Sequence, residues 1–262
     1  MVFNETVLVI APDRDSGDAF DTELTKAGLQ TEVIYPKIAP RVLGDTLNRS
    51  GEVERDLAKV FRTALESGHK NIAIACNTLQ FYVPSALKLL GEKVPDFTIY
   101  TTFDALRKKY PDINNRPIML ATTPTSKEIK DFPVPNTLEI ENLQDLVQEA
   151  ILRIKKIGGS DISTAFENVK NEDLSLDEQV SKVKALGVQI GKKLKETNQD
   201  TAVLACTELP ILFFRYFNDT ERVKFLDIEF VDPASVLAEF LSEFQETLST
   251  KERHRKRGSE LN

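Results

Sequence analysis

The chain has 262 residues, a net charge of −7, 41% hydrophobic residues and 29% charged residues, a composition typical of a soluble globular protein with one large domain or two lobes. Its apolar runs are far shorter than the roughly 20 residues of a membrane-spanning helix, and its start lacks the features of a secretory signal. Its two cysteines are too few for a disulfide framework, so we expect a cytoplasmic protein in a reducing compartment.

The short apolar runs give no reason to expect a membrane as a partner, and the charge distribution argues against nucleic acid. Residues 251–260 carry a net charge of +3, which leaves −10 for the rest of the chain. An acidic body of this kind is a poor match for the phosphate backbone of nucleic acid. We interpret the short basic segment as a solvated terminus, since chain ends are usually disordered unless they are tied down.

In the first part of the chain, short β-branched runs alternate with segments of helical periodicity. The expected strands are residues 7–11, 30–35, 71–75 and 97–100. The expected helices are residues 18–27, 52–67 and 84–90, the first two ending at Gly28 and Gly68, because glycine commonly terminates a helix.

A second series of the same kind follows. The expected strands are residues 117–122, 138–140, 203–205 and 225–228. The expected helices are residues 103–109, a weak helix from about 126, then 145–156, 176–195 and 234–248. Residues 158–174 are polar and have little regular pattern, which favours a lid or flap over a site.

Strands that alternate with helices of this length predict an α/β protein with parallel sheets. We expect two pseudo-symmetric lobes, each a parallel sheet flanked by helices, with an active site in the cleft between them. The first lobe is predicted to be discontinuous, comprising residues 1–100 and 213–262, because the late strand and closing helix are expected to return to it. The second lobe is predicted to comprise residues 101–212.

The two cysteines lie in matching contexts. Cys76 follows the expected strand 71–75 and precedes Asn77 and Thr78, while Cys206 follows a similar apolar run and precedes Thr207 and Glu208. Ligands of parallel sheets gather beyond the carboxyl ends of the strands. This repeat, with the cysteines 130 residues apart, predicts a duplicated half-site with one sulfur from each half facing a common cleft.

The neighbouring polar groups have a plausible role in binding. A helix N-terminus is expected to lower a thiol pKa from its ordinary value of about 8.5. We expect Asn77, Thr78 and Thr207, with nearby backbone N–H groups, to hold a substrate carboxylate, and Glu208 to orient a thiol or bind an ammonium group. The alternative is two buried structural cysteines, which behave as small hydrophobes; the repeated context favours catalysis.

The sequences Cys76-Asn77-Thr78 and Cys206-Thr207-Glu208-Leu209-Pro210 resemble those of the aspartate/glutamate racemase superfamily. The segment from Leu120 to Thr125, which includes Thr122, is similar to a strand and loop of that family, and Asp232-Pro233 after a late strand also fits. The resemblance spans nearly the whole chain. The Glu after Cys-Thr resembles the aspartate racemase branch, because glutamate racemases usually carry His there.

The resemblance implies a racemase of an acidic amino acid that needs neither pyridoxal phosphate nor a metal. One cysteine removes the α-proton as a thiolate, and the other returns a proton to the opposite face as a thiol. Asn77, Thr78, Thr125 and Thr207 would hold the α-carboxylate or the ammonium group. Arg49 and Lys170 resemble the family's arginine and flap lysine and would bind a side-chain carboxylate. Members of the family are often homodimers, and we expect one here.

Two departures from the family pattern affect the expected substrate. The glycine-rich loop after the first strand is absent, and Asp15-Ser16-Gly17, although similar to the Asp-Ser-Gly loop of glutamate racemases, lies later than expected, so we assign it no role. Gln80 stands where the family usually has His. Two alternatives therefore stay open: a dicarboxylate cis-trans isomerase or decarboxylase of the same superfamily, and a catalytically silent binding protein for a small acid.

Other catalytic signatures are missing. His69 and His254 are not spaced for a metal site or a catalytic triad, and the sequence has no Gly-x-Gly-x-x-Gly or Walker motif. The cysteine pair is therefore the main candidate for the chemistry.

Overall fold

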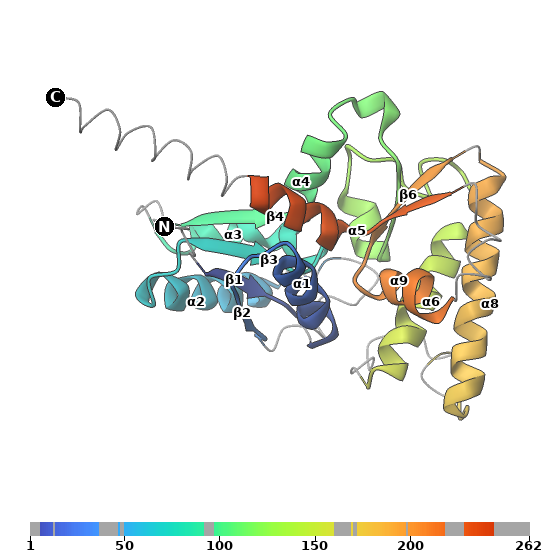
Figure 1. The fold of residues 1–262 in the computed structure, drawn as a ribbon, viewed down its shortest axis with the longest axis horizontal. Helices are drawn as coiled ribbons and strands as arrows, with labels where there is room; N and C mark the ends of the chain where they lie inside the picture. Colours follow the sequence, from blue (N-terminus) through green and yellow to red (C-terminus); the bar gives the residue numbers. More distant parts are fainter. Residues whose placement is uncertain are drawn as a thin grey trace.

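The computed structural model describes residues 6–12, 14–36, 47, 50–91, 97–159, 169, 172–197, 199–217 and 228–243. Two parallel sheets lie side by side, each with helices packed against it (Figure 1). The strand order is β2-β1-β3-β4 in the first sheet and β5-β6-β7 in the second. The predicted α/β class and the two lobes with parallel sheets are confirmed.

The first sheet contains four short parallel strands. They are β1 (Val7–Ile10), β2 (Thr31–Ile34), β3 (Asn71–Ile74) and β4 (Thr98–Thr101). The helices of this half are α1 (Arg14–Lys26), α2 (Glu52–Glu66), the 3-10 helix η2 (Leu79–Tyr82), α3 (Val83–Lys88) and α4 (Thr102–Lys109). The chain passes from β2 across β1 to β3, so the strand order reverses between β1 and β3, where sheets of this kind bind ligands.

The second sheet contains three parallel strands, β5 (Ile118–Ala121), β6 (Thr201–Ala205) and β7 (Glu229–Val231). Its helices are the 3-10 helix η3 (Ile113–Asn115), α5 (Thr123–Glu128), α6 (Leu143–Ile157), α8 (Leu176–Lys195), α9 (Glu208–Pro210) and the π-helix η4 (Ile211–Tyr216). Residues 233–243 are helical and follow β7 directly. Ser175 and Glu178 form a capping box at the start of α8.

Side chains that point alternately to the two sides of each strand form the core. In β1, Val7 and Val9 point to one side of the sheet and Leu8 and Ile10 to the other, and all four are buried. The side of Val7 faces a core that also contains Met119 and other residues of the second sheet, together with residues of α1, α4 and the helical residues 233–243. The two sheets therefore share one central core, which holds the carboxyl ends of their strands close together.

Some predicted elements differ from the structure. Helix α1 begins at Arg14, four residues before the predicted start. Residues 138–140 do not form a strand, because hydrogen bonds from the Leu138 and Ile140 N–H groups to Val134 and Pro135 carbonyls hold a turn in which Glu139 has a φ of 52°. Most of the predicted lid at 158–174 and the end of the predicted helix 234–248 lie outside the described residues.

The late strand was predicted to join the first lobe, and this is wrong. Strand β7 begins at Glu229 and pairs with β6 as the third strand of the second sheet. Two paired strands alone have marginal stability, so this third strand stabilises the sheet. The helical residues that follow do reach the first sheet's core, through Leu237 and Leu241. Ser235 Oγ also donates a hydrogen bond to Glu23 of α1 at 2.9 Å.

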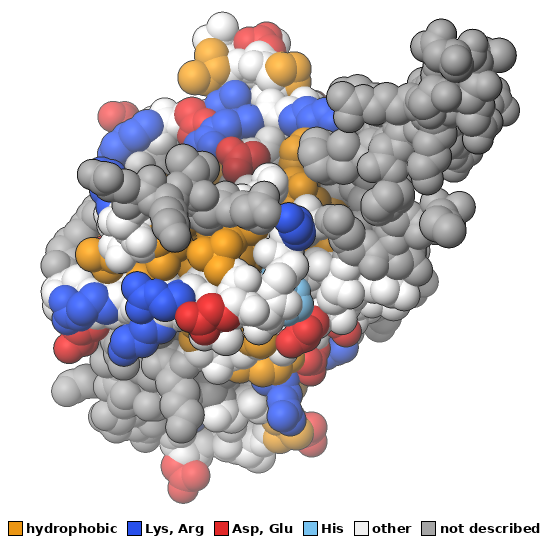
Figure 2. Space-filling model, turned by 90° about the vertical axis from the view of Figure 1, so that its left-hand side faces the viewer, with side chains coloured by type: hydrophobic (Ala, Val, Ile, Leu, Met, Phe, Trp, Pro, Cys, Tyr) orange, Lys and Arg blue, Asp and Glu red, His pale blue; other side chains and the backbone are white. Residues whose placement is uncertain are grey.

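Charged side chains of both signs lie on the face of the molecule that Figure 2 shows. Figure 2 shows one face of the molecule, on which Lys and Arg side chains are interspersed with Asp and Glu and a band of hydrophobic side chains crosses the centre. No helix in the described part of the chain is long and apolar enough to cross a membrane.

Candidate active site

The two cysteines occupy equivalent places in the two sheets. Cys76 follows β3 and Cys206 follows β6, and each of these strands lies between two neighbours in its sheet. Both cysteines are half-buried, and they are not joined by a disulfide. The loop after Cys76 is joined to the second half of the molecule by hydrogen bonds from Thr78 to Thr122 and Thr125.

Glu208 holds the thiol of Cys206. The Cys206 Sγ donates a hydrogen bond to Glu208 Oε2 at 2.7 Å, and the Thr207 hydroxyl donates to the same oxygen at 3.2 Å. The other carboxylate oxygen forms an ion pair with Lys155 of α6. The side chains of Glu208 and Lys155 are only 2% and 5% exposed, so this is a buried ion pair that supports one of the two cysteines.

The pKa of Cys206 differs from the prediction. We expected a helix N-terminus to lower it, but α9 has only three residues. Burial of the thiol and the negative charge of Glu208 instead raise the pKa of Cys206 well above its ordinary value, against the lowering effect of Lys155. Cys206 is therefore a protonated thiol at neutral pH.

Three threonine hydroxyls connect the two halves of the molecule. The Thr78 Oγ1 lies 3.0 Å from Thr122 Oγ1 and 2.8 Å from Thr125 Oγ1, and the latter two atoms are 3.0 Å apart. All three side chains are buried. A hydroxyl both donates and accepts, so a ring of three satisfies each member. Thr78 follows Cys76 closely, so this ring ties the first cysteine's loop to the start of α5.

A second link between the halves lies beside the other cysteine. The Ser16 Oγ of α1 is 2.8 Å from the Thr207 Oγ1, and Ser16 is buried. Gly17 allows α1 to pack this closely on β2, because a Cβ there would lie 2.9 Å from Val33 and 2.5 Å from Tyr35. The Asp15-Ser16-Gly17 sequence, to which we assigned no role, thus places Ser16 against the residue that follows Cys206.

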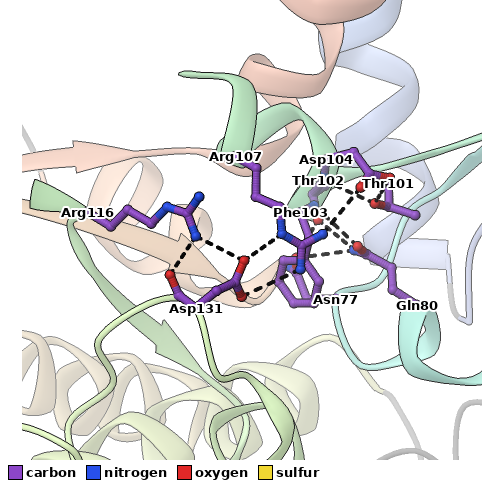
Figure 3. A network of polar contacts seen from close by, with 9 residues as sticks. All are labelled: Asn77, Gln80, Thr101, Thr102, Phe103, Asp104, Arg107, Arg116 and Asp131. Carbon is purple, nitrogen blue, oxygen red and sulfur yellow. Dashed lines mark hydrogen bonds and ion pairs between the residues drawn. The ribbon is translucent and has the colours of Figure 1, made fainter. Parts of the chain in front are cut away.

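Gln80 fixes the loop that follows Cys76 (Figure 3). Its Nε2 donates to Thr102 Oγ1 at 2.6 Å, to Asn77 Oδ1 at 3.3 Å and to the Cys76 carbonyl at 3.4 Å. Its Oε1 accepts from the Phe103 N–H at 3.3 Å. The Thr102 hydroxyl donates to Asn77 Oδ1 at 2.5 Å. Because the Asn77 oxygen is used in this way, its NH₂ group is what Asn77 offers a ligand.

A neighbouring cluster of charges joins α4 to the segment after α5 (Figure 3). Asp131 accepts from Arg107 Nε at 2.5 Å and from Arg116 Nη1 at 3.0 Å. Burial alone would raise the pKa of Asp131, but the hydrogen bond and charges of these arginines outweigh it and lower the pKa. Since Thr102 lies on α4 and Thr125 on α5, this cluster helps to hold both in place.

Helix α6 supports the site with a row of buried polar side chains. Gln144 donates to the Ala121 carbonyl at 3.0 Å, Gln148 accepts from the Thr123 N–H at 2.8 Å, and Lys155 pairs with Glu208. The intervals of four and seven residues place all three on one face of the helix. One helix thus contacts the ends of both β5 and β6.

Eight of the predicted site residues lie at the carboxyl ends of the strands, in two hydrogen-bonded groups: Cys76, Asn77, Thr78, Thr122 and Thr125 in one, and Cys206, Thr207 and Glu208 in the other. Arg49 and Lys170 lie outside the described residues. The sequence analysis did not identify Ser16 or Lys155. A signal for Lys155 was present, because it lies three and four residues after the fully buried Leu152 and Ile151 and is therefore a charge on the apolar face of α6.

The described residues contain no group of three or more His, Cys, Asp or Glu side chains that could hold a metal ion. The polar groups around the cysteines are hydroxyls, amides and one paired carboxylate, and these are suited to binding the carboxylate and ammonium groups of a small organic acid.

Neither a known family model nor a curated protein matches the chain. Solved structures do match. The chain is similar to an aspartate racemase from Picrophilus torridus, with a TM-score of 0.61 and 16% identity over 92% of this chain and 94% of that one. It is also similar to an aspartate racemase homologue from Pyrococcus horikoshii OT3, with a TM-score of 0.57 and 16% identity over 92% and 99% of the two chains.

A glutamate racemase from Bacillus anthracis gives a TM-score of 0.55 and 14% identity, over 93% of this chain and 82% of that one. Identities this low establish the fold alone. The chain therefore has the two-lobed α/β fold of the aspartate and glutamate racemases, as the resemblance at its two cysteines implied.

Proposed function

We propose that this protein racemises an acidic amino acid, aspartate or glutamate, without a cofactor, by proton transfer between Cys76 and Cys206. The observation that carries the proposal is the equivalent placement of the two cysteines after the interior strands of two sheets, whose carboxyl ends are joined by hydrogen bonds from Thr78 to Thr122 and Thr125. Two thiols that approach from the two halves of a molecule are suited to act on opposite faces of one carbon. The similarity of the fold to that of racemases supports the same activity.

In the proposed reaction Cys76 begins as the thiolate and Cys206 as the thiol. The Cys76 sulfur takes the α-proton, and the electron pair of the broken C–H bond stays on the α-carbon. The Cys206 thiol then gives its proton to the opposite face of that carbon, which leaves Cys206 as a thiolate. The raised pKa of Cys206 supports its role as the proton donor in this direction. The reverse sequence converts the other enantiomer.

The polar groups beside the sulfurs would bind the amino acid. The Asn77 NH₂ group is a donor for the α-carboxylate, since its oxygen already accepts from Thr102 and Gln80. The ring formed by Thr78, Thr122 and Thr125 offers hydroxyls that both donate and accept. Donors held in fixed positions stabilise the charge that develops on the carboxylate as the carbanion forms. Arg49 and Lys170 remain the proposed ligands of the side-chain carboxylate.

The test is α-proton exchange in deuterium oxide. The purified protein, without pyridoxal phosphate, is incubated with L- and D-aspartate, L- and D-glutamate and other amino acids and followed by proton NMR. Exchange with inversion that is lost in both Cys76→Ser and Cys206→Ser supports two-base racemisation. Thr63→Val, an exposed change on α2, is the control and should retain the activity of the unmodified protein.

The other outcomes separate the alternatives. A decarboxylase should retain activity on a suitable dicarboxylic acid when one cysteine is replaced. A cis-trans isomerase should form a covalent adduct with one cysteine, detectable by mass spectrometry. A binding protein should be stabilised by a small acid and exchange no α-proton. Absence of exchange with every amino acid would overturn the racemase proposal.

A further inference from the structure

Lys155 is a buried cation that contacts Glu208, the residue that accepts the hydrogen bond of the Cys206 thiol. It lies on α6, its side chain is 5% exposed, and it forms an ion pair with a Glu208 carboxylate that is 2% exposed. A buried charge of either sign is costly unless it is paired. The sequence context supplies no local reason for a lysine there, because its neighbours on the same face of α6 include the fully buried Ile151 and Leu152.

The ion pair has a defined geometry toward the thiol. Lys155 contacts one oxygen of Glu208, while the other oxygen accepts the hydrogen bond from Cys206 Sγ. With one oxygen paired to Lys155, the other oxygen of the carboxylate is left to accept from the thiol. Lys155 therefore fixes which oxygen of Glu208 faces Cys206.

We propose that Lys155 is a positioning residue for Cys206, acting through Glu208. It holds the carboxylate that orients the thiol, and its positive charge offsets the negative charge that arises when Cys206 gives up its proton. The role of Lys155 in turnover rests on the proposed racemisation, whereas its effect on the ionisation of Cys206 does not.

Among the described residues, the charged groups that act most strongly on Cys206 are Glu208 on its own segment and Lys155 from α6, with a smaller effect of Cys76 from the first sheet. Their effect on the thiol can be measured directly. The rate at which a neutral alkylating reagent such as iodoacetamide modifies Cys206 follows the thiolate fraction. Mass spectrometry of the Cys206 peptide measures this rate over a range of pH and separates it from modification of Cys76.

The key variants are Lys155→Met, Lys155→Arg, Glu208→Gln and the double variant Lys155→Met with Glu208→Gln. Lys155→Met should slow alkylation of Cys206 by about tenfold or more at a fixed pH, because one unit of pKa changes the thiolate fraction by a factor of about ten. Glu208→Gln should accelerate it, since Lys155 then acts on the thiol unopposed. Lys155→Arg should restore most of the rate of the unmodified protein.

The double variant keeps the test decisive if the Lys155→Met protein does not fold. Replacing both partners by neutral side chains of similar size leaves no unpaired buried charge, and its rate should lie between those of the two single variants. If Lys155→Met does not fold, the double variant must still react more slowly than Glu208→Gln. Lys59→Met, on the exposed face of α2, is the matched control and should leave the rate unchanged.

A merely structural role for Lys155 predicts the opposite sign. Loosening α6 would admit water to Cys206 and bring its pKa toward the ordinary value, so Lys155→Met would accelerate alkylation. An unchanged or faster rate in a folded Lys155→Met protein overturns the inference. Alkylation rates that follow the expected order in a protein that exchanges no α-proton with any amino acid would support the positioning role and overturn only the proposed function.

Discussion

Ser16 and Thr207 are 191 residues apart in the sequence, and their hydroxyl oxygens lie 2.8 Å apart. Ser16 is in the first turn of α1, which packs on the first sheet, while Thr207 follows Cys206 at the end of β6 in the second sheet. This hydrogen bond and the threonine ring near Cys76 place one polar link between the halves beside each cysteine. The relative position of the two sulfurs depends on both links.

Removing the hydrogen bond between Ser16 and Thr207 should lower the rate of α-proton exchange more than it lowers the stability of the fold. Ser16→Ala deletes one buried hydrogen bond, which contributes about 1 kcal/mol to the free energy of unfolding. We expect a small loss of stability in chemical denaturation and a clear decrease in the rate of α-proton exchange. Ser242→Ala removes an exposed hydrogen bond to the Ala27 carbonyl and is the control. Equal effects of the two substitutions on exchange would contradict the prediction.

Removing a hydroxyl from the ring of Thr78, Thr122 and Thr125 should lower both stability and activity, because the ring is buried. Thr125 is fully buried and its hydroxyl bonds to both Thr78 and Thr122. Thr125→Val keeps the shape and removes the hydroxyl, so we expect a loss of about 1–3 kcal/mol in the free energy of unfolding and a large loss of α-proton exchange. Thr125→Ser keeps the hydroxyl and should retain most of the exchange rate. Comparable exchange by the two variants would show that the hydroxyl has no role.

Replacing Gly187 by alanine should destabilise the protein, although alanine has the higher helix propensity. A Cβ at Gly187 in α8 would lie 2.7 Å from the ring of Phe217 and 3.1 Å from Leu212. Gly187→Ala should therefore lower the free energy of unfolding by about 1–3 kcal/mol through overpacking. The control is Ala185→Gly on the exposed side of α8, which should cost about 1 kcal/mol from helix propensity alone. Thermal denaturation measures both, and stabilisation by Gly187→Ala would contradict the packing.

Asp232 should make stability depend on pH. Burial raises its pKa from 3.8 to about 6, and the charge of Glu23 adds to the effect. Because the folded protein then binds this proton more tightly than the unfolded chain, the Asp232 carboxyl destabilises the fold increasingly as the pH rises from about 4 through about 6.

Asp232→Asn removes this ionisation. An asparagine can still cap the following helix, where Asp232 Oδ1 accepts from the Ala234 N–H at 2.8 Å. We expect the variant to be more stable than the unmodified protein at neutral pH by up to about 3 kcal/mol, with the difference vanishing in acid. Urea denaturation over this pH range measures it. A difference that does not change with pH would be inconsistent with the raised pKa.

Local sequence patterns predicted the repeating elements of the fold. Short β-branched runs at 7–11 and 71–75 and helical periods at 52–67 and 176–195 each correspond to an element of the structure, because apolar residues at period two or 3.6 have only one way to face a core. The context of each cysteine likewise placed it at the carboxyl end of a strand. The pattern at 138–140 failed, because three residues were too few there to distinguish a strand from a turn.

The tertiary structure decided which distant groups meet. The pairing of β7 with β6, the contact of Ser16 with Thr207 and the ion pair of Lys155 with Glu208 join residues from separate segments, and no local pattern encodes them. The pKa of Cys206 follows from the same fact. A sequence shows the strand and the short helix beside a thiol, but burial and the charges of Glu208 and Lys155, which set the sign of the shift, exist only once the segments have packed together.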